Sequence, residues 1–329
     1  MGTRILVACI GLPLLLAVVL FLPPLATAIL FAAACVIAAY EMLWRTGILK
    51  HKRILVYTAV MAAATVMWSW MRACAVVSEQ TLWVSMLIGL FVYFCALFCE
   101  LLAAHTKLQF SALCVALFSG IVYPFLIGAL VRLRGMQDGK YFILVAFVLS
   151  MVADSGAYFV GRACGKHKLA PVISPKKTVE GAIGGIAANI LAMALYTLLL
   201  NKCFGFTQVN YFYAAIYGVV GAIGSIVGDL TLSVVKRQVG IKDYGNLLPG
   251  HGGILDRFDS TMIVAPMAEI LMLLHRLHRP ADAGGHRAAS RPRCGADRRK
   301  QRRAYGAAVP QIPPGACGHG HAAGGAGAA

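Results

Sequence analysis

The sequence predicts an all-α polytopic membrane protein with about nine transmembrane helices, whose cytoplasmic loops form a polar site. Of its 329 residues, 59% are hydrophobic and only 13% are charged, and the mean hydropathy is +0.74. Soluble domains carry roughly 45–50% apolar and about 25% charged residues, so no aqueous fold could bury this much apolar surface. A bilayer is therefore the environment that the composition predicts.

Nine segments reach or approach the length of about 20 mostly apolar residues that a spanning helix needs. They lie near residues 5–22, 25–44, 54–71, 82–102, 112–131, 141–160, 182–200, 211–228 and 260–276. Arg4 precedes the first run as in a signal peptide, but no A-x-A-like cleavage site follows, so we interpret this run as a helix. The chain then divides into N-terminal transmembrane helices (1–139), a C-terminal transmembrane region (140–276) and a tail (277–329).

Basic residues indicate the orientation of these segments. The chain has 30 Lys and Arg against 13 Asp and Glu, a formal net charge of +17. Basic loops follow the second and the sixth segments, and the positive-inside bias places both, together with residues 229–259, in the cytoplasm. Because these charges lie in short loops between apolar segments, they suit lipid headgroups or phosphorylated substrates, and nucleic-acid binding is not expected.

The tail differs in composition from the rest of the chain. Ala, Gly and Arg make up 33 of the last 54 residues, and large apolar residues are few. Such a segment cannot bury enough surface to offset its ordering entropy, which predicts a low-complexity, disordered tail. A second interpretation is that this stretch arises from reading a GC-rich gene out of frame.

Acidic residues at bilayer depth are costly and mark functional sites by default. Glu41 and Glu100 lie near helix ends, where snorkelling or an interhelical hydrogen bond explains them, and Glu269 suits a structural polar contact. Asp154 and Asp229 differ, because each opens into one of the two polar cytoplasmic stretches. These two aspartates are the stronger site candidates.

The first polar stretch runs from Asp154 to Gly185 and combines glycines with lysines beside hydroxyl groups. Glycines permit close backbone approach, and lysines with hydroxyls suit phosphate oxygens. No G-x-x-x-x-G-K-[ST] string occurs, so this is not a Walker A loop. A loop that only fixes topology is the alternative, but it would need the lysines and neither the glycines nor the acids.

The second polar stretch follows the eighth segment. If that helix continues past the membrane, Ser225, Asp229, Ser233 and Lys236 or Arg237 recur at three- or four-residue steps and share one face. A cationic and an acidic group would then point into one cavity.

Asp256 and Asp259 lie three residues apart and are predicted to share a face at the start of the ninth helix. Carboxylates among lysines, without Cys/His zinc spacing, suit Mg²⁺ shared with substrate phosphates. In the alternative interpretation, Asp256 and Asp259 only form salt bridges with Arg257 or Lys236.

These residues carry a resemblance to a known family. The string Ser233-x-x-Lys236-Arg237-x4-Lys242-Asp243, followed by Pro249-x-His251-Gly252-Gly253-x-x-Asp256-Arg257-x-Asp259, resembles the signature of the phosphatidate cytidylyltransferase (CDP-diacylglycerol synthase) family. The stretch Ser-Pro-Lys-Lys-Thr-x-Glu-Gly within residues 174–181 is similar to the same family, and so is Tyr40-Glu41. The resemblance is strong over residues 140–265 and stops near residue 275.

The resemblance implies a Mg²⁺-dependent reaction of CTP with phosphatidic acid that gives CDP-diacylglycerol and pyrophosphate, for phospholipid biosynthesis. It implies an integral protein of the bacterial cytoplasmic (inner) membrane with its active site facing the cytoplasm among membrane lipids, and it leaves a homodimer open. Residues 140–276 would then be the catalytic region.

From these residues and the resemblance together we assign candidate roles. The catalytic candidates are Asp229, Lys236, Arg237, His251, Asp256, Arg257 and Asp259, of which Asp229 and Asp256 are the expected metal ligands. The candidates for phosphate binding are Ser174, Lys176, Lys177, Thr178, Lys242, Gly252 and Gly253. The remaining candidates are Asp154, Glu180, Ser233 and Asp243.

Two other functions stay open at this point. A CTP-dependent kinase for polyprenol or phytol could share a cytidine-nucleotide site but would release CDP. An ion-coupled transporter would place Asp154 and Asp229 along a pathway through the membrane. The sequence shows no inverted repeat, and its polar stretches gather on one side, which favours the transferase.

Overall fold

The helices follow one another along the chain in the order that the hydropathy predicts. In the computed structural model, which describes residues 2–204, 210–247 and 252–277, a single small hairpin interrupts the described helices. In chain order the first elements are α1 (Gly2–Phe21), α2 (Pro24–Tyr40), the π-helix η1 (Glu41–Arg45), α3 (Lys52–Ala73), α4 (Glu79–Ala103), α5 (Phe110–Leu117), the π-helix η2 (Phe118–Val122) and α6 (Tyr123–Gly135).

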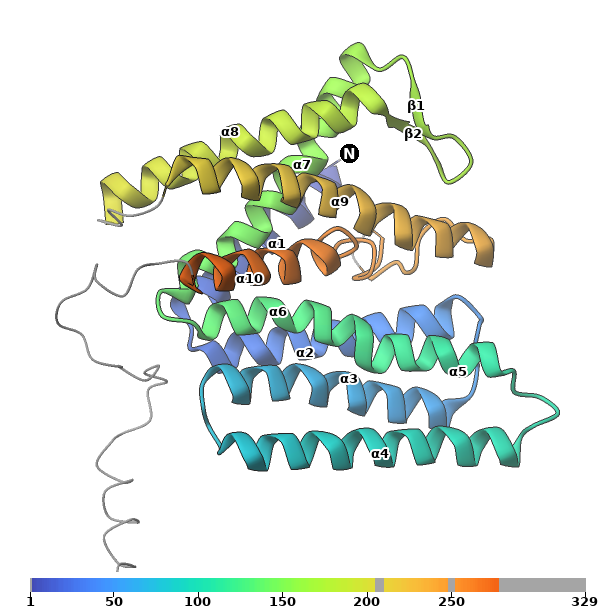
Figure 1. Cartoon of the computed structure of the whole chain (residues 1–329). Coiled ribbons are helices and arrows are strands. Elements are labelled where there is room, and N and C mark those ends of the chain that lie inside the picture. The colour runs from blue at the N-terminus through green and yellow to red at the C-terminus, as the bar shows by residue number, and fades with distance from the viewer. Residues whose placement is uncertain (1, 205–209, 248–251, 278–329) are drawn as a thin grey trace, which may run out of the picture. The chain divides into compact units, whose positions relative to one another are not determined.

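The second half begins with α7 (Gly139–Cys164) and contains the hairpin. It continues with strands β1 (Lys168–Ala170) and β2 (Ser174–Thr178), then α8 (Val179–Phe204), α9 (Tyr211–Val239) and α10 (Thr261–Leu277). The strands are antiparallel, with Lys168 opposite Thr178 and Ala170 opposite Ser174. Helix α10 packs against α6, α7 and α9, and so joins the two halves (Figure 1).

The all-α membrane fold is confirmed, whereas the count of nine spans is not. Among the described residues, seven helices are long and apolar enough to cross a membrane: Pro24–Arg45, Lys52–Ala73, Glu79–Ala103, Phe110–Gly135, Gly139–Cys164, Val179–Phe204 and Tyr211–Val239. The first and ninth segments correspond to shorter apolar helices, Gly11–Phe21 and Thr261–His275. At 1.5 Å per residue the 17-residue α10 is about 26 Å long, less than the roughly 30 Å of a hydrocarbon core.

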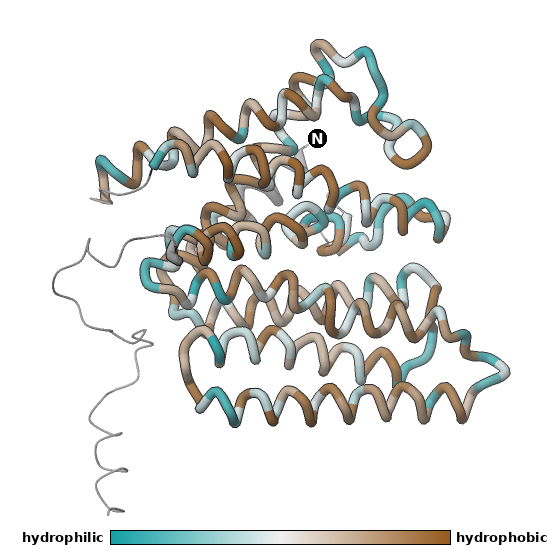
Figure 2. The backbone as a smooth tube through the Cα atoms, viewed as in Figure 1, coloured by the Kyte–Doolittle hydropathy of each residue, from teal (hydrophilic) through white to brown (hydrophobic). Residues whose placement is uncertain are grey.

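Large apolar side chains cover the outside of these helices. Phe91 on α4, Leu102 on α4 and Phe159 on α7 are 70%, 74% and 68% exposed, and Figure 2 shows hydrophobic residues along the helices, with hydrophilic residues at the hairpin and at one end of α9. A soluble protein does not expose so much apolar surface. These side chains are placed to face lipid.

Small residues allow α7 and α8 to approach closely. A Cβ atom added at Gly184 would lie 2.4 Å from the Val160 side chain, and one at Gly156 would lie 2.6 Å from Ala188. Close contact through small residues is how helices associate in membranes. These two glycines of the Asp154–Gly185 stretch therefore permit close backbone approach between two helices.

The loop between α2 and α3, the hairpin and the C-terminal end of α9 lie at the same end of the described helices (Figure 1). This agrees with the predicted orientation, in which the polar stretches after the second, sixth and eighth segments share one side. The predicted tail, residues 277–329, lies outside the described residues except for Leu277 at the end of α10.

Candidate functional site

Helix α9 supplies the longest row of polar side chains at this end. It continues to Val239, as the spacing of its polar residues predicted, and ends at Gly240, whose φ of 75° terminates the helix. Ser225, Ser233 and Lys236 are buried on this helix. The Ser233 hydroxyl donates to Asp229 Oδ1 over 3.0 Å, one turn away. The row therefore consists of hydrogen-bonded groups on one face.

Lysine 177 connects β2 to this row. Its Nζ lies 2.5 Å from Asp229 Oδ2, and both side chains are about one-quarter exposed. Strand β2 turns Lys177 and Lys176 to opposite faces, because successive side chains of a strand alternate, and Lys176 is exposed. The hairpin thus brings one of its two lysines to the acidic residue of α9.

Asp154 on α7 lies next to this row of polar side chains on α9. Ser225 Oγ donates to its Oδ1 over 2.8 Å, and Ser260 Oγ, just before α10, donates to its Oδ2 over 3.2 Å. Three segments therefore converge on this carboxylate. Asp154 is nevertheless exposed, so a ligand can reach it.

Asp259 adds a third carboxylate near Asp154 and Asp229. Burial, followed by the charge of Asp229, raises the pKa of Asp259 to about 7, and the Asp154 carboxylate acts in the same direction. Burial and the neighbouring negative charges thus both disfavour the ionised form of Asp259. We call Asp154, Asp229 and Asp259 the acidic cluster.

Asp256 has a different environment. It is buried, and its Oδ1 accepts from Lys236 Nζ over 2.9 Å. Its Oδ2 accepts from the backbone N–H groups of Tyr244 (2.8 Å) and Gly253 (3.0 Å). Gly252 next to it has a φ of +89°, which favours glycine. Asp256 therefore holds together the segments on both sides of residues 248–251.

The prediction that Asp256 and Asp259 share a face of the ninth helix is wrong. Helix α10 begins at Thr261, and both aspartates precede it in a turn in which Arg257 N donates to Ile254 O over 3.0 Å. The turn directs the Asp256 side chain to Lys236 and the Asp259 side chain towards Asp154 and Asp229. The salt bridge considered for Asp256 does form with Lys236.

The other predicted residues lie around these two centres. Arg237 is exposed, and its Nε donates to the Ile173 carbonyl over 3.0 Å, linking α9 to the hairpin. The Thr178 hydroxyl accepts from Gly181 N at the start of α8, and Glu180 accepts from the backbone N–H groups of Lys166 and His167. Both therefore have local partners that shape the hairpin.

The remaining predicted residues divide by exposure. Ser174 and Gly252 are half-buried, Gly253 is buried, and Lys242, Asp243 and Arg257 are exposed. His251 lies outside the described residues.

Three contributors were not among the predicted site residues. Ser260 binds Asp154, and Tyr244 donates its hydroxyl to Leu232 O over 3.0 Å while its backbone binds Asp256. The third is Glu41, which we interpreted as a snorkelling or interhelical residue but which binds the loop before α10. The sequence signals that could have identified Tyr244 and Glu41 are an aromatic residue in a polar loop and an acid at a helix end.

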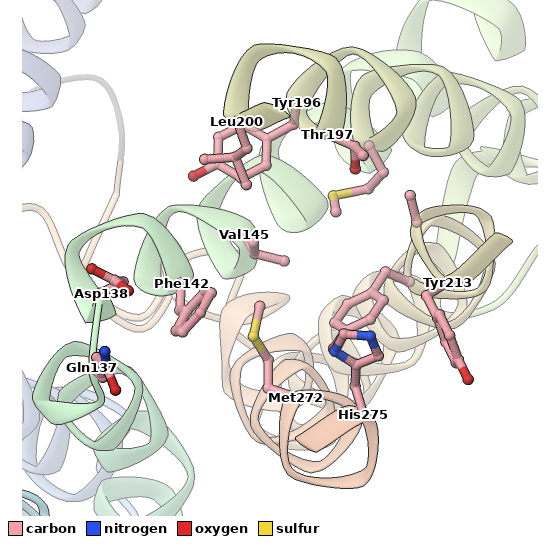
Figure 3. Close-up of a pocket in the computed structure, with 13 residues that line it drawn as sticks. Gln137, Asp138, Phe142, Val145, Tyr196, Thr197, Leu200, Tyr213, Met272 and His275 are labelled. Atoms are coloured by element: carbon pink, nitrogen blue, oxygen red, sulfur yellow. The ribbon is translucent and has the colours of Figure 1, made fainter. Parts of the chain in front are cut away.

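A separate pocket of about 480 Å³ lies at the other end of α7–α10 (Figure 3). Its lining includes Phe142, Tyr196, Tyr213 and His275, from the start of α7, the end of α8, the start of α9 and the end of α10. None of the predicted site residues lines it. It is therefore distinct from the acidic cluster.

The fold and the site define an all-α polytopic membrane protein with carboxylates, lysines and hydroxyls gathered at one end of its helices. The chain belongs to the cytidylyltransferase family, because the family model described as "Cytidylyltransferase family" matches residues 2–275.

Curated relatives match less than half of the chain. A phosphatidate cytidylyltransferase of Staphylococcus haemolyticus is 43% identical over 137 residues, 42% of this chain and 51% of that protein. One of Staphylococcus epidermidis is 44% identical over 137 residues with the same shares, and one of Staphylococcus saprophyticus is 42% identical over 147 residues, 45% and 55% of the two chains. The chain thus spans about half the length of the curated relatives it matches.

Proposed function

We propose that this protein is a phosphatidate cytidylyltransferase, which converts CTP and phosphatidate into CDP-diacylglycerol and pyrophosphate. The observation that carries the proposal is the acidic cluster beside Lys177 at one end of membrane-spanning helices, within the region matched by the family. A lipid phosphate and a water-soluble nucleotide can meet only at such an interface. The names of the relatives support the same substrates.

The acidic cluster suits a divalent cation by its donor chemistry. Within the part of the chain that the structure describes, no group of three or more His, Cys, Asp or Glu side chains could hold a metal ion. Mg²⁺ usually binds one or two carboxylates together with substrate phosphates and water, so it does not need three protein side chains. We propose Asp229 and Asp259 as its ligands, because the oxygens of Asp256 already accept three hydrogen bonds from the protein.

The residues of this chain position the reactants. A phosphatidate oxygen forms a bond to the α-phosphorus of CTP while the bond from that phosphorus to the bridging β-phosphate oxygen breaks, and pyrophosphate leaves. Lys177 pairs with Asp229 in the structure. In the proposed reaction it turns to the phosphates when CTP binds. Bound Mg²⁺ would supply positive charge to the transferring and leaving phosphates. Lys236, neutralised by Asp256, keeps the loop in place.

We propose that the site faces the cytoplasm of a bacterial cell, where CTP is found, and that the protein lies in the cytoplasmic membrane. The basic loops on this side support the orientation. Val172, 89% exposed in the hairpin turn, offers a test. An epitope inserted after it should be accessible to antibody in permeabilised cells and inaccessible in intact spheroplasts, and the reverse would refute the orientation.

The reaction can be tested with CTP labelled separately on its α- and γ-phosphates. Purified protein with Mg²⁺ and phosphatidate should transfer the α label to lipid and release the γ label in pyrophosphate. A CTP-dependent lipid kinase would instead transfer the γ label to a polyprenol or phytol. Failure to label lipid with either, with active transport by the same preparation, would favour the transporter. Chelation of divalent cations should stop the transfer, and added Mg²⁺ should restore it.

A further inference from the structure

Glu41 lies far from the predicted signature in the sequence but contacts it in the fold. It is the first residue of η1, at the end of α2, and only 2% of it is exposed. Its Oε1 accepts from Ile254 N over 3.1 Å and its Oε2 accepts from Leu255 N over 3.0 Å. Both oxygens of a buried carboxylate are thus bound to backbone more than 200 residues away.

The backbone on both sides of residues 248–251 surrounds this carboxylate. A Cβ atom added at Gly245 would lie 2.4 Å from Glu41 Oε1, and one at Gly253 would lie 2.5 Å from both carboxylate oxygens. A side chain at either position would displace Glu41. The two glycines therefore leave the space that this one carboxylate fills.

Two carboxylates divide the donors of one turn between them. The consecutive N–H groups of Gly253, Ile254 and Leu255 donate to Asp256, Glu41 and Glu41. Hydrogen bonds to a charged acceptor are about twice as strong as neutral ones, and a buried donor without a partner is costly. The turn that leads to Asp259 is consequently fixed from two sides.

Glu41 lies where α2 passes into a π-helix. In η1 the Thr46 N–H donates to the Glu41 carbonyl over 3.3 Å, the i to i+5 pattern of a π-helix. Glu41 itself keeps the right-handed helical backbone of α2 (φ −61°, ψ −46°), and its N–H donates to Ile37 O, so α2 sets the position of its side chain. Single π-helical turns are frequent at functional sites.

We infer that Glu41 is a positioning residue of the active site: it fixes the turn at residues 253–255 and thereby the acidic cluster on which the reaction depends. The inference gives the N-terminal helices, through α2, a direct part in the chemistry of the C-terminal half. Its catalytic consequence rests on the proposed function, whereas the contact itself does not.

The test compares Glu41→Gln with Glu100→Gln. Glutamine is nearly isosteric, but its amide nitrogen is a donor and would face a backbone donor, so one hydrogen bond to the turn is lost. Glu100 is a matched control, because it is also a buried glutamate of the N-terminal helices, and its contacts are with His51, Arg53 and Tyr57.

Hydrogen exchange without substrate measures the contact. Amide exchange in peptides covering residues 252–260 should accelerate at least fivefold in Glu41→Gln and stay within twofold of wild type in Glu100→Gln. Unchanged exchange in Glu41→Gln, or an equal increase in both variants, would overturn the inference. This result does not depend on which reaction the protein catalyses.

Kinetics measure the consequence. In Glu41→Gln, kcat should fall at least tenfold and the Mg²⁺ concentration for half-maximal activity should rise at least threefold, because the cluster is displaced. A folding defect would only reduce the active fraction and leave the Mg²⁺ dependence unchanged, which would overturn the positioning role. Glu41→Asp keeps both acceptors and should recover part of kcat. If wild type itself transfers no cytidylyl group, the proposed function fails while the exchange result stands.

Discussion

The acidic side chains of the N-terminal and C-terminal helices have different neighbours. In α4, Glu100 is approached by the Tyr57 hydroxyl, the His51 imidazole and the Arg53 guanidinium, so one acid has a cation and two polar groups as neighbours. In the C-terminal half, the three acids of the acidic cluster lie near one another, and Lys177 pairs with one of them. In the first arrangement, the protein itself supplies the partners of the carboxylate. The second leaves negative charge for a ligand to neutralise, which is the pattern expected of a binding site rather than of a structural contact.

Packing differs in the same way. The cluster of buried residues around Leu97, Leu113 and Ile54 is apolar and belongs to the N-terminal helices. In the C-terminal half, α7 and α8 meet through small residues, and the polar row of α9 lies beside them. In the proposed function the N-terminal half supports the site, and Glu41 is its contact with the turn before α10.

The largest effect is expected for Asp229→Asn. The change removes one charge from the acidic cluster and releases Lys177 from its partner, so kcat/KM should fall at least 100-fold, about 2.7 kcal/mol of transition-state stabilisation. Thermal stability in detergent should change little, because Asp229 is only half-buried.

Asp138→Asn is the matched control for Asp229→Asn. It removes an acid at the opposite end of α7, and asparagine tolerates the φ of 60° found there. Activity above about one-tenth of wild type in Asp229→Asn would exclude Asp229 as an essential ligand.

Asp256→Asn should reduce activity by about tenfold or more and also lower stability. Its amide nitrogen would face backbone donors, and the buried Lys236 would lose its counter-charge, a loss of about 3–5 kcal/mol in comparable buried pairs. Thermal denaturation without Mg²⁺ separates the two roles proposed for this residue. A metal ligand alone would leave the metal-free melting temperature unchanged, whereas the organising role requires that it fall.

The difference between Asp229 and Asp256 also marks the limit of what the sequence could predict. Hydropathy placed the seven long helices, and periodicity placed Ser225, Asp229 and Ser233 on one face, because these patterns are local. Periodicity could not predict that the side chains of Asp256 and Asp259 point to different partners, since their directions depend on a turn rather than on a helix. Glu41 was misinterpreted for a related reason, because its partners are backbone groups more than 200 residues away in the chain.

Lys177→Ala should have a smaller, more selective effect. Loss of a phosphate-binding cation should raise KM for CTP about tenfold, or about 1.4 kcal/mol, with kcat lowered less. Lys176→Ala, which removes the exposed neighbour on the other face of β2, should raise KM by less than threefold. Equal effects of the two changes on KM would indicate that the hairpin attracts nucleotide by its charge alone.

Glu269→Gln should affect catalysis least and tests whether a buried charge pair outside the site is only structural. Arg132 on α6 donates from Nε to Glu269 Oε1 over 2.7 Å and from Nη2 to Oε2 over 2.8 Å, and both side chains are about one-eighth exposed. Leaving a buried guanidinium without its carboxylate should lower stability, by at most about 3–5 kcal/mol. Per folded molecule, kcat/KM should stay within about threefold of wild type, because α10 carries Glu269 more than two turns beyond Ser260. A change in KM for CTP or in Mg²⁺ dependence at unchanged folded fraction would show that this ion pair, which joins the two halves, also controls the site.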